Sequence, residues 1–106
     1  MGDYKLYDKP SVIIHADGTQ ESYQHGLLHR NDDKPSVIYT DGTQEWYQHG
    51  LLHRDSVDVD NNNMCKPAII ESDGTQLWYK NGILLKVNKV NKVNKVNKVN
   101  KVNKKK

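Results

Sequence analysis

The sequence predicts an all-β protein: an antiparallel meander of about three tandem repeats of about 24 residues, forming a single-layer or lightly curved sheet and followed by a disordered basic C-terminal tail. Three observations lead to this prediction. A segment typified by residues 34–54 occurs three times with changes. Each copy contains an Asp-Gly pair and, eight residues later, a His-Gly or Asn-Gly pair, both of which favour hairpin turns. From Lys86 the chain repeats Lys-Val-Asn.

The predicted repeat domain covers most of the chain. It spans residues 1–86, with copies at approximately 9–33, 34–54 and 66–86, a polar loop at 55–65, and a tail at 87–106. With 35% apolar residues and no phenylalanine, the chain is too small and too polar for a large closed core. Packing each copy against its neighbours is the usual solution for such a sequence.

The first turn of the second copy, Asp41-Gly42, is predicted to be a two-residue type I′ loop, in which both central positions have positive φ. This loop length fixes the pairing of the two strands that it joins. It places Val37 opposite Trp46 and Ile38 opposite Glu45.

The second turn, His49-Gly50, places Tyr47 opposite Leu52 and Trp46 opposite His53. Side chains alternate between the two faces of a strand, so this register assigns each residue to a face. We assign to the core the face whose residues all three copies keep. Its members are Ile14, Ile38, Ile70, Tyr23, Tyr47, Tyr79, Leu28, Leu52 and Leu84.

The opposite face varies between copies, because serine stands at position 22 where the later copies have tryptophan. The candidate protein-contact residues on this side are Trp46, Trp78, Leu51 and Ile83. The alternative is that this face packs against loops, a neighbouring sheet or a second molecule. At the edge of the core face, Glu21 and Glu45 are the predicted cross-strand partners of Arg30 and Arg54.

The chain resembles a known class of repeat. The pattern Asp-Gly-x-x-x-(Trp/Tyr)-Tyr-x-(Asn/His)-Gly-x-Leu-His-Arg, with Lys-Pro leading into the next unit, is similar to MORN-like tandem repeats over about residues 4–86. Closely similar copies are met in uncharacterised proteins of large DNA viruses and some bacteria. The resemblance implies a β-meander with a scaffolding or binding role, and it carries over no catalytic residue.

The histidines do not form a predicted metal site. His25 and His29, like His49 and His53, have the i, i+4 spacing of a helical zinc pair, but glycine lies between them and the local pattern is strand and turn. Turn and strand positions explain all four. No catalytic set and no cofactor-binding motif can be made out either, so the sequence predicts a protein that is not an enzyme.

The loop at 55–65 opens like a calcium-binding loop with Asp58-x-Asp60-x-Asn62, but the match then fails. Asn63 stands where glycine is required, and Ile69 stands where a bidentate glutamate is required. Cys65 is the only cysteine, so it can form neither an internal disulfide nor a zinc set. We interpret the loop as a polar spacer.

Charge divides the chain into an acidic body and a basic tail. Residues 1–85 hold 7 basic and 13 acidic residues, a net charge of −6, whereas residues 86–106 hold 9 lysines and no acid, a net charge of +9. A period of three suits neither helix nor strand, which predicts disorder. The candidate contacts for nucleic acid or anionic lipid are Lys86, Lys89, Lys92, Lys95, Lys98, Lys101, Lys104, Lys105 and Lys106. The alternative is that the tail is a simple repeat expansion without a function of its own.

Taken alone, the sequence favours a non-enzymatic protein–protein interaction or scaffold module, with weak, non-specific polyanion tethering through the tail as the alternative. It contains no apolar stretch that approaches the roughly 18 residues of a membrane span, and its amino end has no hydrophobic signal region. We therefore expect an intracellular, cytoplasmic protein. The sequence specifies neither the partner nor the oligomeric state.

Overall fold

A computed structural model describes residues 9–90 and confirms the predicted all-β class. Its strands are β1 (Ser11–Ile14), β2 (Gln20–Gln24), β3 (Leu27–Leu28), β4 (Val37–Ile38), β5 (Gln44–Glu45), β6 (Tyr47–Gln48), β7 (Leu51–Leu52), β8 (Val57–Asp58), β9 (Met64–Cys65), β10 (Ile69–Ile70), β11 (Gln76–Lys80) and β12 (Ile83–Asn88). A short 3₁₀ helix, η1 (Val59–Asn61), lies in the long loop. The described strands pair only in antiparallel fashion.

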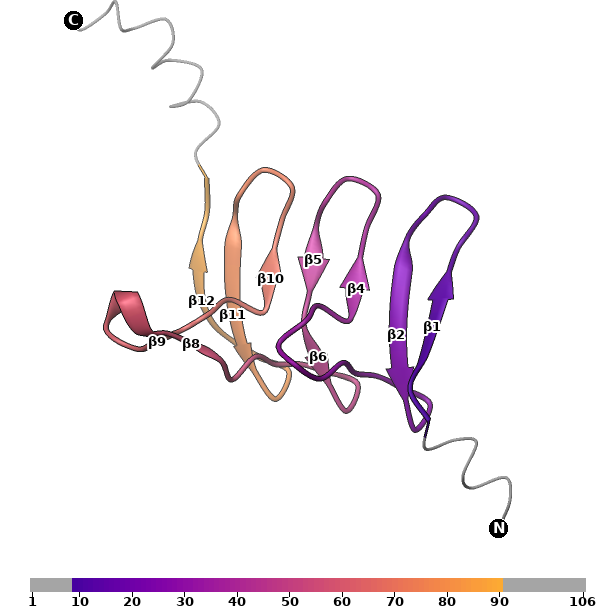
Figure 1. Cartoon of the computed structure of the whole chain (residues 1–106). Helices are drawn as coiled ribbons and strands as arrows, with labels where there is room; N and C mark the ends of the chain where they lie inside the picture. The colour runs from indigo at the N-terminus through magenta and orange to yellow at the C-terminus, as the bar shows by residue number, and fades with distance from the viewer. Residues whose placement is uncertain (1–8, 91–106) are drawn as a thin grey trace, which may run out of the picture.

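The main sheet is a meander in the order β1-β2-β4-β5-β10-β11-β12, with β3 paired to β2. Within each copy, the first strand pairs with at least the first half of the second strand, and the third strand pairs with its second half. In the third copy, β12 pairs along the whole of β11. The first strand of the next copy pairs with the outer side of that same first half. The three first turns therefore form a row along one edge of the sheet, and the three second turns form a row along the opposite edge (Figure 1).

The predicted register of the second hairpin is confirmed. Tyr47 lies opposite Leu52 and Gln48 opposite Leu51. The equivalent pairs in the other copies are Tyr23 with Leu28 and Tyr79 with Leu84. His25, His49 and Asn81 take the left-handed conformation that such turns require, with φ of 54°, 53° and 50°.

The first hairpin is offset by one residue from the prediction. Val37 lies opposite Glu45 and Ile38 opposite Gln44, whereas a two-residue loop would place Trp46 opposite Val37. The other copies have the same offset, with Ile14 opposite Gln20 and Ile70 opposite Gln76. The prediction of a type I′ turn is therefore wrong.

The turn itself explains the offset. Gly42 has φ of +94°, but Asp41 has no positive φ, so the loop contains three residues and not two. Gly42 N–H donates to the Tyr39 carbonyl at 3.0 Å, and Tyr39 N–H donates to the Thr43 carbonyl at 2.9 Å. The Asp41 carboxylate accepts from Thr43 N–H at 2.8 Å, which stabilises this conformation locally.

The offset changes which aliphatic residue faces the tyrosines. Val37 lies across from Glu45, which alternates with Tyr47, so Val37 shares a face with Tyr47 and Leu52. Val37 is buried, whereas Ile38 is only half-buried. The assignment of Ile14, Ile38 and Ile70 to the face of the tyrosines is wrong, and Ile13, Val37 and Ile69 take that place.

The predicted glutamate–arginine pairs are also wrong. Glu45 instead accepts hydrogen bonds from the Tyr39 hydroxyl at 3.2 Å and the Tyr47 hydroxyl at 3.1 Å. Burial and the nearby Glu45 carboxylate raise the pKa of Tyr47 above its usual value. In the first copy, Glu21 bonds to Tyr23 and His15 in the same way, and not to Arg30.

Neighbouring copies are joined at the row of second turns by a pair of hydrogen bonds. Gly50 N–H donates to the Leu28 carbonyl at 2.8 Å, and His49 N–H donates to Nδ1 of His29 at 3.0 Å. The junction between the second and third copies repeats both bonds, with Gly82 on Leu52 and Asn81 on His53, each at 2.8 Å. We call this two-bond contact the turn clamp.

The buried interior is small and contains several polar groups. Among residues 9–90, the buried hydrophobic side chains are Val37, Trp46 and Ala68, and the buried polar ones are Ser22, His29, Ser36, Arg54 and Thr75. Their buried nitrogen and oxygen atoms have hydrogen-bond partners throughout the described chain. The sheet is therefore stabilised by buried hydrogen bonds as well as by the burial of a few apolar side chains.

The repeat domain extends beyond its predicted end at residue 86. β12 continues through Val87 to Asn88 and stays paired with β11 across a bulge. The first Lys-Val-Asn unit of the tail is therefore part of the sheet. The predicted disorder from residue 91 onward lies outside the described residues.

The turn clamp predicts an asymmetric effect of exchanging histidine and leucine. Replacing His53 with leucine, the residue that the third copy has at the same position, leaves Asn81 N–H without its acceptor. We expect His53→Leu to lower the free energy of unfolding by about 1 kcal/mol in urea denaturation. The reverse change, Leu85→His, adds the acceptor at the end of the third copy and is the matched control. Equal losses in the two variants would contradict the clamp.

Candidate functional site

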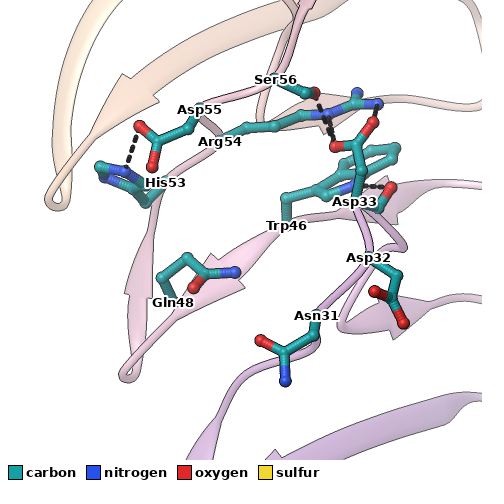
Figure 2. A pocket seen from close by; sticks show the side chains of 9 residues that line it. All are labelled: Asn31, Asp32, Asp33, Trp46, Gln48, His53, Arg54, Asp55 and Ser56. Atoms are coloured by element: carbon teal, nitrogen blue, oxygen red, sulfur yellow. Dashed lines mark hydrogen bonds and ion pairs between the residues drawn. The ribbon is translucent and has the colours of Figure 1, made fainter.

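A hollow of about 220 Å³ lies where the link between the first two copies meets the end of the second copy (Figure 2). It is lined by Asn31, Asp32, Asp33, Trp46, Gln48, His53, Arg54, Asp55 and Ser56. Three of these residues are aspartates and two carry an aromatic or imidazole ring, all of which are groups that can bind a ligand. The hydrogen bonds of its members decide what it can do.

The strongest interaction in the hollow joins Asp33 and Arg54. Nε of Arg54 donates to one carboxylate oxygen at 2.8 Å, and Nη2 donates to the other at 3.0 Å. This is the bidentate arrangement that matches the planar guanidinium to a carboxylate. Because Arg54 is only 8% exposed, loss of its partner would leave a buried charge without compensation.

Arg54 also contacts two further parts of the chain. Its guanidinium carbon lies 3.8 Å from the centroid of the Trp46 ring, within the range of a cation–π contact. Its Nη1 donates to the Pro67 carbonyl at 3.0 Å, which reaches the beginning of the third copy. One side chain therefore connects the link before the second copy, the second copy itself and the third copy.

The surroundings of Asp33 hold its carboxyl group in the ionised form. Hydrogen bonds from Arg54 lower the pKa of Asp33 to about 2, opposed by partial burial and helped by the Ser56 hydroxyl. Ser56 Oγ donates to the carboxylate at 2.7 Å, and the Lys66 ammonium lies 3.7 Å away. The carboxylate is thus surrounded by donors of this chain.

The charged groups Arg54 and Asp33 have structural roles in the hollow. Nε, Nη1 and Nη2 of Arg54 each donate to an atom of the protein, and Asp33 accepts from two residues. Nδ1 of His53 accepts a hydrogen bond from Asn81 N–H, and Nε2 of His53 is hydrogen-bonded to Oδ1 of Asp55. Within residues 9–90, no group of three or more histidine, cysteine, aspartate or glutamate side chains is arranged to hold a metal ion.

The two tryptophans among the candidate contact residues lie inward. Trp46 is 6% exposed, and its indole N–H donates to the Asp33 carbonyl at 3.0 Å. Trp78 is half-buried, and its indole N–H donates to the Cys65 carbonyl at 2.7 Å. Each ring thus fastens the segment that leads into its own copy, so the expectation that Trp46 presents an exposed contact surface is wrong. For Trp46 the packing alternative holds.

The other two candidates, Leu51 and Ile83, are exposed. They are 49% and 65% exposed, and Leu27, which lies at the same position in the first copy, is 47% exposed. All three directly follow the glycine of a second turn. We call Leu27, Leu51 and Ile83 the apolar ridge. Leu27 was not among the predicted contact residues, although all three copies have an aliphatic residue at this position.

Close packing of the turns holds the apolar ridge together. A Cβ atom added to Gly50 would lie 3.4 Å from Cδ2 of Leu27, and one added to Gly82 would lie 3.4 Å from Cδ2 of Leu51. Each leucine therefore packs over the glycine of the next copy, beside the turn clamp. The three ridge side chains lie at equivalent positions along the edge of the sheet that carries the second turns.

Most of the candidate polyanion contacts lie outside the described residues. Of the nine lysines, Lys86 and Lys89 fall within them. The Lys86 ammonium lies 4.9 Å from the centroid of the Trp78 ring, the same relation that Arg54 has to Trp46. Polyanion binding through Lys92 to Lys106 stays a prediction from the sequence. Within residues 9–90, no helix is long and apolar enough to cross a membrane.

The Asp33–Arg54 pair predicts a pH-dependent contribution to stability. The pKa of Asp33 is lower in the folded state than its ordinary value of 3.8, so the stabilisation is present above pH 4 and is lost as the pH falls through about 2. The carboxylate is 33% exposed, so we allow for solvent screening and expect Asp33→Asn to cost about 1 to 2 kcal/mol near neutral pH.

The measurement is urea unfolding of both proteins between pH 6 and pH 2, where the difference should shrink with acidification. Asp32→Asn is the matched control, because Asp32 is adjacent and makes no ion pair in the described structure. A constant difference across the pH range would contradict the assigned role of the ionised pair.

Comparisons with known proteins do not assign the chain to a family. No family model, curated protein or solved structure matches it. The resemblance to MORN-like repeats therefore stays a prediction from the residues that carry it.

Proposed function

We propose that the chain is a non-enzymatic protein–protein interaction or scaffold module that contacts its partner through the apolar ridge. The observation that carries this proposal is the alignment of three exposed aliphatic side chains, Leu27, Leu51 and Ile83, at equivalent positions of successive copies. An exposed apolar row of this kind on a protein with so small an interior is costly to keep in water unless another surface covers it.

The way in which the ridge is built supports a role in recognition. The turn clamp fixes the second turns of the second and third copies to the preceding copy, through Gly50 on Leu28 and Gly82 on Leu52. The ridge side chains therefore keep a regular spacing without ordering upon binding. Preorganised contacts lose less conformational entropy when a partner binds.

The chemistry of the ridge indicates the kind of partner. Leucine and isoleucine side chains bind apolar surfaces and offer no hydrogen bonds, so the partner should present a matching apolar row. The resemblance to MORN-like repeats points in the same direction, because that class is associated with scaffolding or binding. The viral relationship that the resemblance suggests is part of the same proposal.

The proposed function predicts that polar residues on the ridge weaken partner binding. We expect the triple variant Leu27→Ser, Leu51→Ser, Ile83→Ser to lose at least tenfold in affinity, which corresponds to about 1.4 kcal/mol. The measurement is quantitative affinity capture from the native cell, followed by titration of the captured protein against wild type and variant.

A matched triple variant provides the control. Val57→Ser, Val59→Ser and Met64→Ser remove three exposed apolar side chains from β8, η1 and β9, outside the ridge. Both variants must first show wild-type unfolding transitions. If the loop variant lost the partner as strongly as the ridge variant did, or if neither lost it, the ridge would not be the contact surface.

A further inference from the structure

β12 is longer than the third strand of the other copies, and its end pairs with the beginning of β11. In the first and second copies, the same part of the second strand pairs with the first strand of the next copy. Val87 lies opposite Leu77 and Asn88 opposite Gln76. The equivalent pairs between copies are Val37 with Glu21, Ile38 with Gln20, Ile69 with Glu45 and Ile70 with Gln44. Val87-Asn88 therefore occupies the position of the first strand of a fourth copy.

The residues that follow β12 extend this equivalence. Val90 N–H donates to Oγ1 of Thr75 at 3.1 Å, just as Ser72 N–H donates to Oγ1 of Thr43 at 3.0 Å. In each case the donor comes two residues after the last pair of the strand. A side-chain position is repeated as well. A Cβ atom added to Gly74 would lie 3.3 Å from Cγ2 of Val90, and one added to Gly18 would lie 3.3 Å from Cγ2 of Thr40.

The outer edge of β12 differs from that of every first strand. β1, β4 and β10 each have a second strand of their own copy on this side, namely β2, β5 and β11. β12 has no neighbour on this side among residues 9–90 (Figure 1). An edge of this kind presents backbone groups that can pair with an extended segment.

The three internal strands that fill this position show what fits it. They are antiparallel, and they place glutamine opposite the residue equivalent to Asn88 and glutamate or leucine opposite the residue equivalent to Val87. Lys86 and Lys89 flank the Val87-Asn88 pair. On an extended strand Lys89 shares a face with Val87, two residues before it, so a carboxylate opposite Val87 would lie on the same face as the Lys89 ammonium, which favours glutamate over leucine.

We propose that the outer edge of β12 binds an extended, acidic segment of another protein, paired antiparallel with Val87 and Asn88. The segment adds one strand to the sheet by backbone hydrogen bonds, and its carboxylate provides specificity through Lys89. This binding mode goes beyond the contact made by the apolar ridge, because it uses backbone groups of a different strand. Either proposal can fail without the other.

The test uses a synthetic peptide with the sequence of residues 42–48, Gly-Thr-Gln-Glu-Trp-Tyr-Gln, which fills the equivalent position beside β4. It is titrated into the full chain and followed by backbone amide chemical shifts and hydrogen exchange. We expect shifts at residues 86–88 and slowed exchange at Val87, whose N–H points away from β11. Lys89→Glu should weaken binding about fivefold, since it reverses one exposed charge beside the carboxylate.

Two control peptides and one control protein make the result decisive. A scrambled peptide and a peptide with an N-methyl group on the backbone nitrogen of its glutamate should not bind, because the first loses the register and the second loses the backbone donor that faces the first strand. The ridge variant should bind the peptide as wild type does, which separates this proposal from the proposed function.

Three outcomes would overturn the proposal. The first is the absence of shifts at residues 86–88 at millimolar peptide. The second is equal binding of the scrambled peptide. The third is a peptide-free chain that sediments as a dimer with the amides of β12 already protected, which would mean that a second copy occupies this edge.

Discussion

The buried guanidinium of Arg54 is the interaction on which the arrangement of the second and third copies depends. It is held by the Asp33 carboxylate, lies over the Trp46 ring and reaches the Pro67 carbonyl. A chain with little apolar burial cannot fix three separate segments by hydrophobic contact alone. A charged group with several donors can do so, because each donor is directional and leaving one unmet inside the protein is costly. Figure 2 shows the carboxylate and the ring converging on this side chain.

The turn clamp extends the same principle along the sheet. Backbone N–H groups of a turn need acceptors, and the preceding copy supplies a carbonyl and an imidazole nitrogen. Histidine stands at this position in the two copies that are followed by another, and leucine stands there in the third, Leu85, which is not. Histidine is therefore found where the second turn of a next copy needs an acceptor, and leucine where no such turn is present in the described part of the chain. The same junction brings Leu27 over Gly50 and Leu51 over Gly82, so the clamp and the apolar ridge are one construction.

Sequence reasoning predicted the fold class and the second hairpin, since the left-handed positions before Gly26, Gly50 and Gly82 leave one loop length. It was wrong at the first hairpin because an Asp-Gly pair suits both a two-residue and a three-residue loop, and the Asp41 side chain selects the latter by accepting from Thr43 N–H. It left open whether Trp46 binds a partner or packs, because the residue that accepts its indole N–H, Asp33, belongs to a link without periodicity. A pattern of faces cannot predict a contact that comes from outside the strands.

The last strand of the sheet, β12, contains residues whose sequence period did not predict a strand. Lys-Val-Asn has a period that suits no regular element, yet Val87 and Asn88 pair with β11. Pairing uses backbone groups, so two residues in the right place suffice when the neighbouring strand already exists. The unit also brings lysine to an edge strand, and charge at such a position discourages association with strands of like or neutral character while it favours acidic ones. The same lysines that keep the edge from self-association thereby select the kind of strand that can join it.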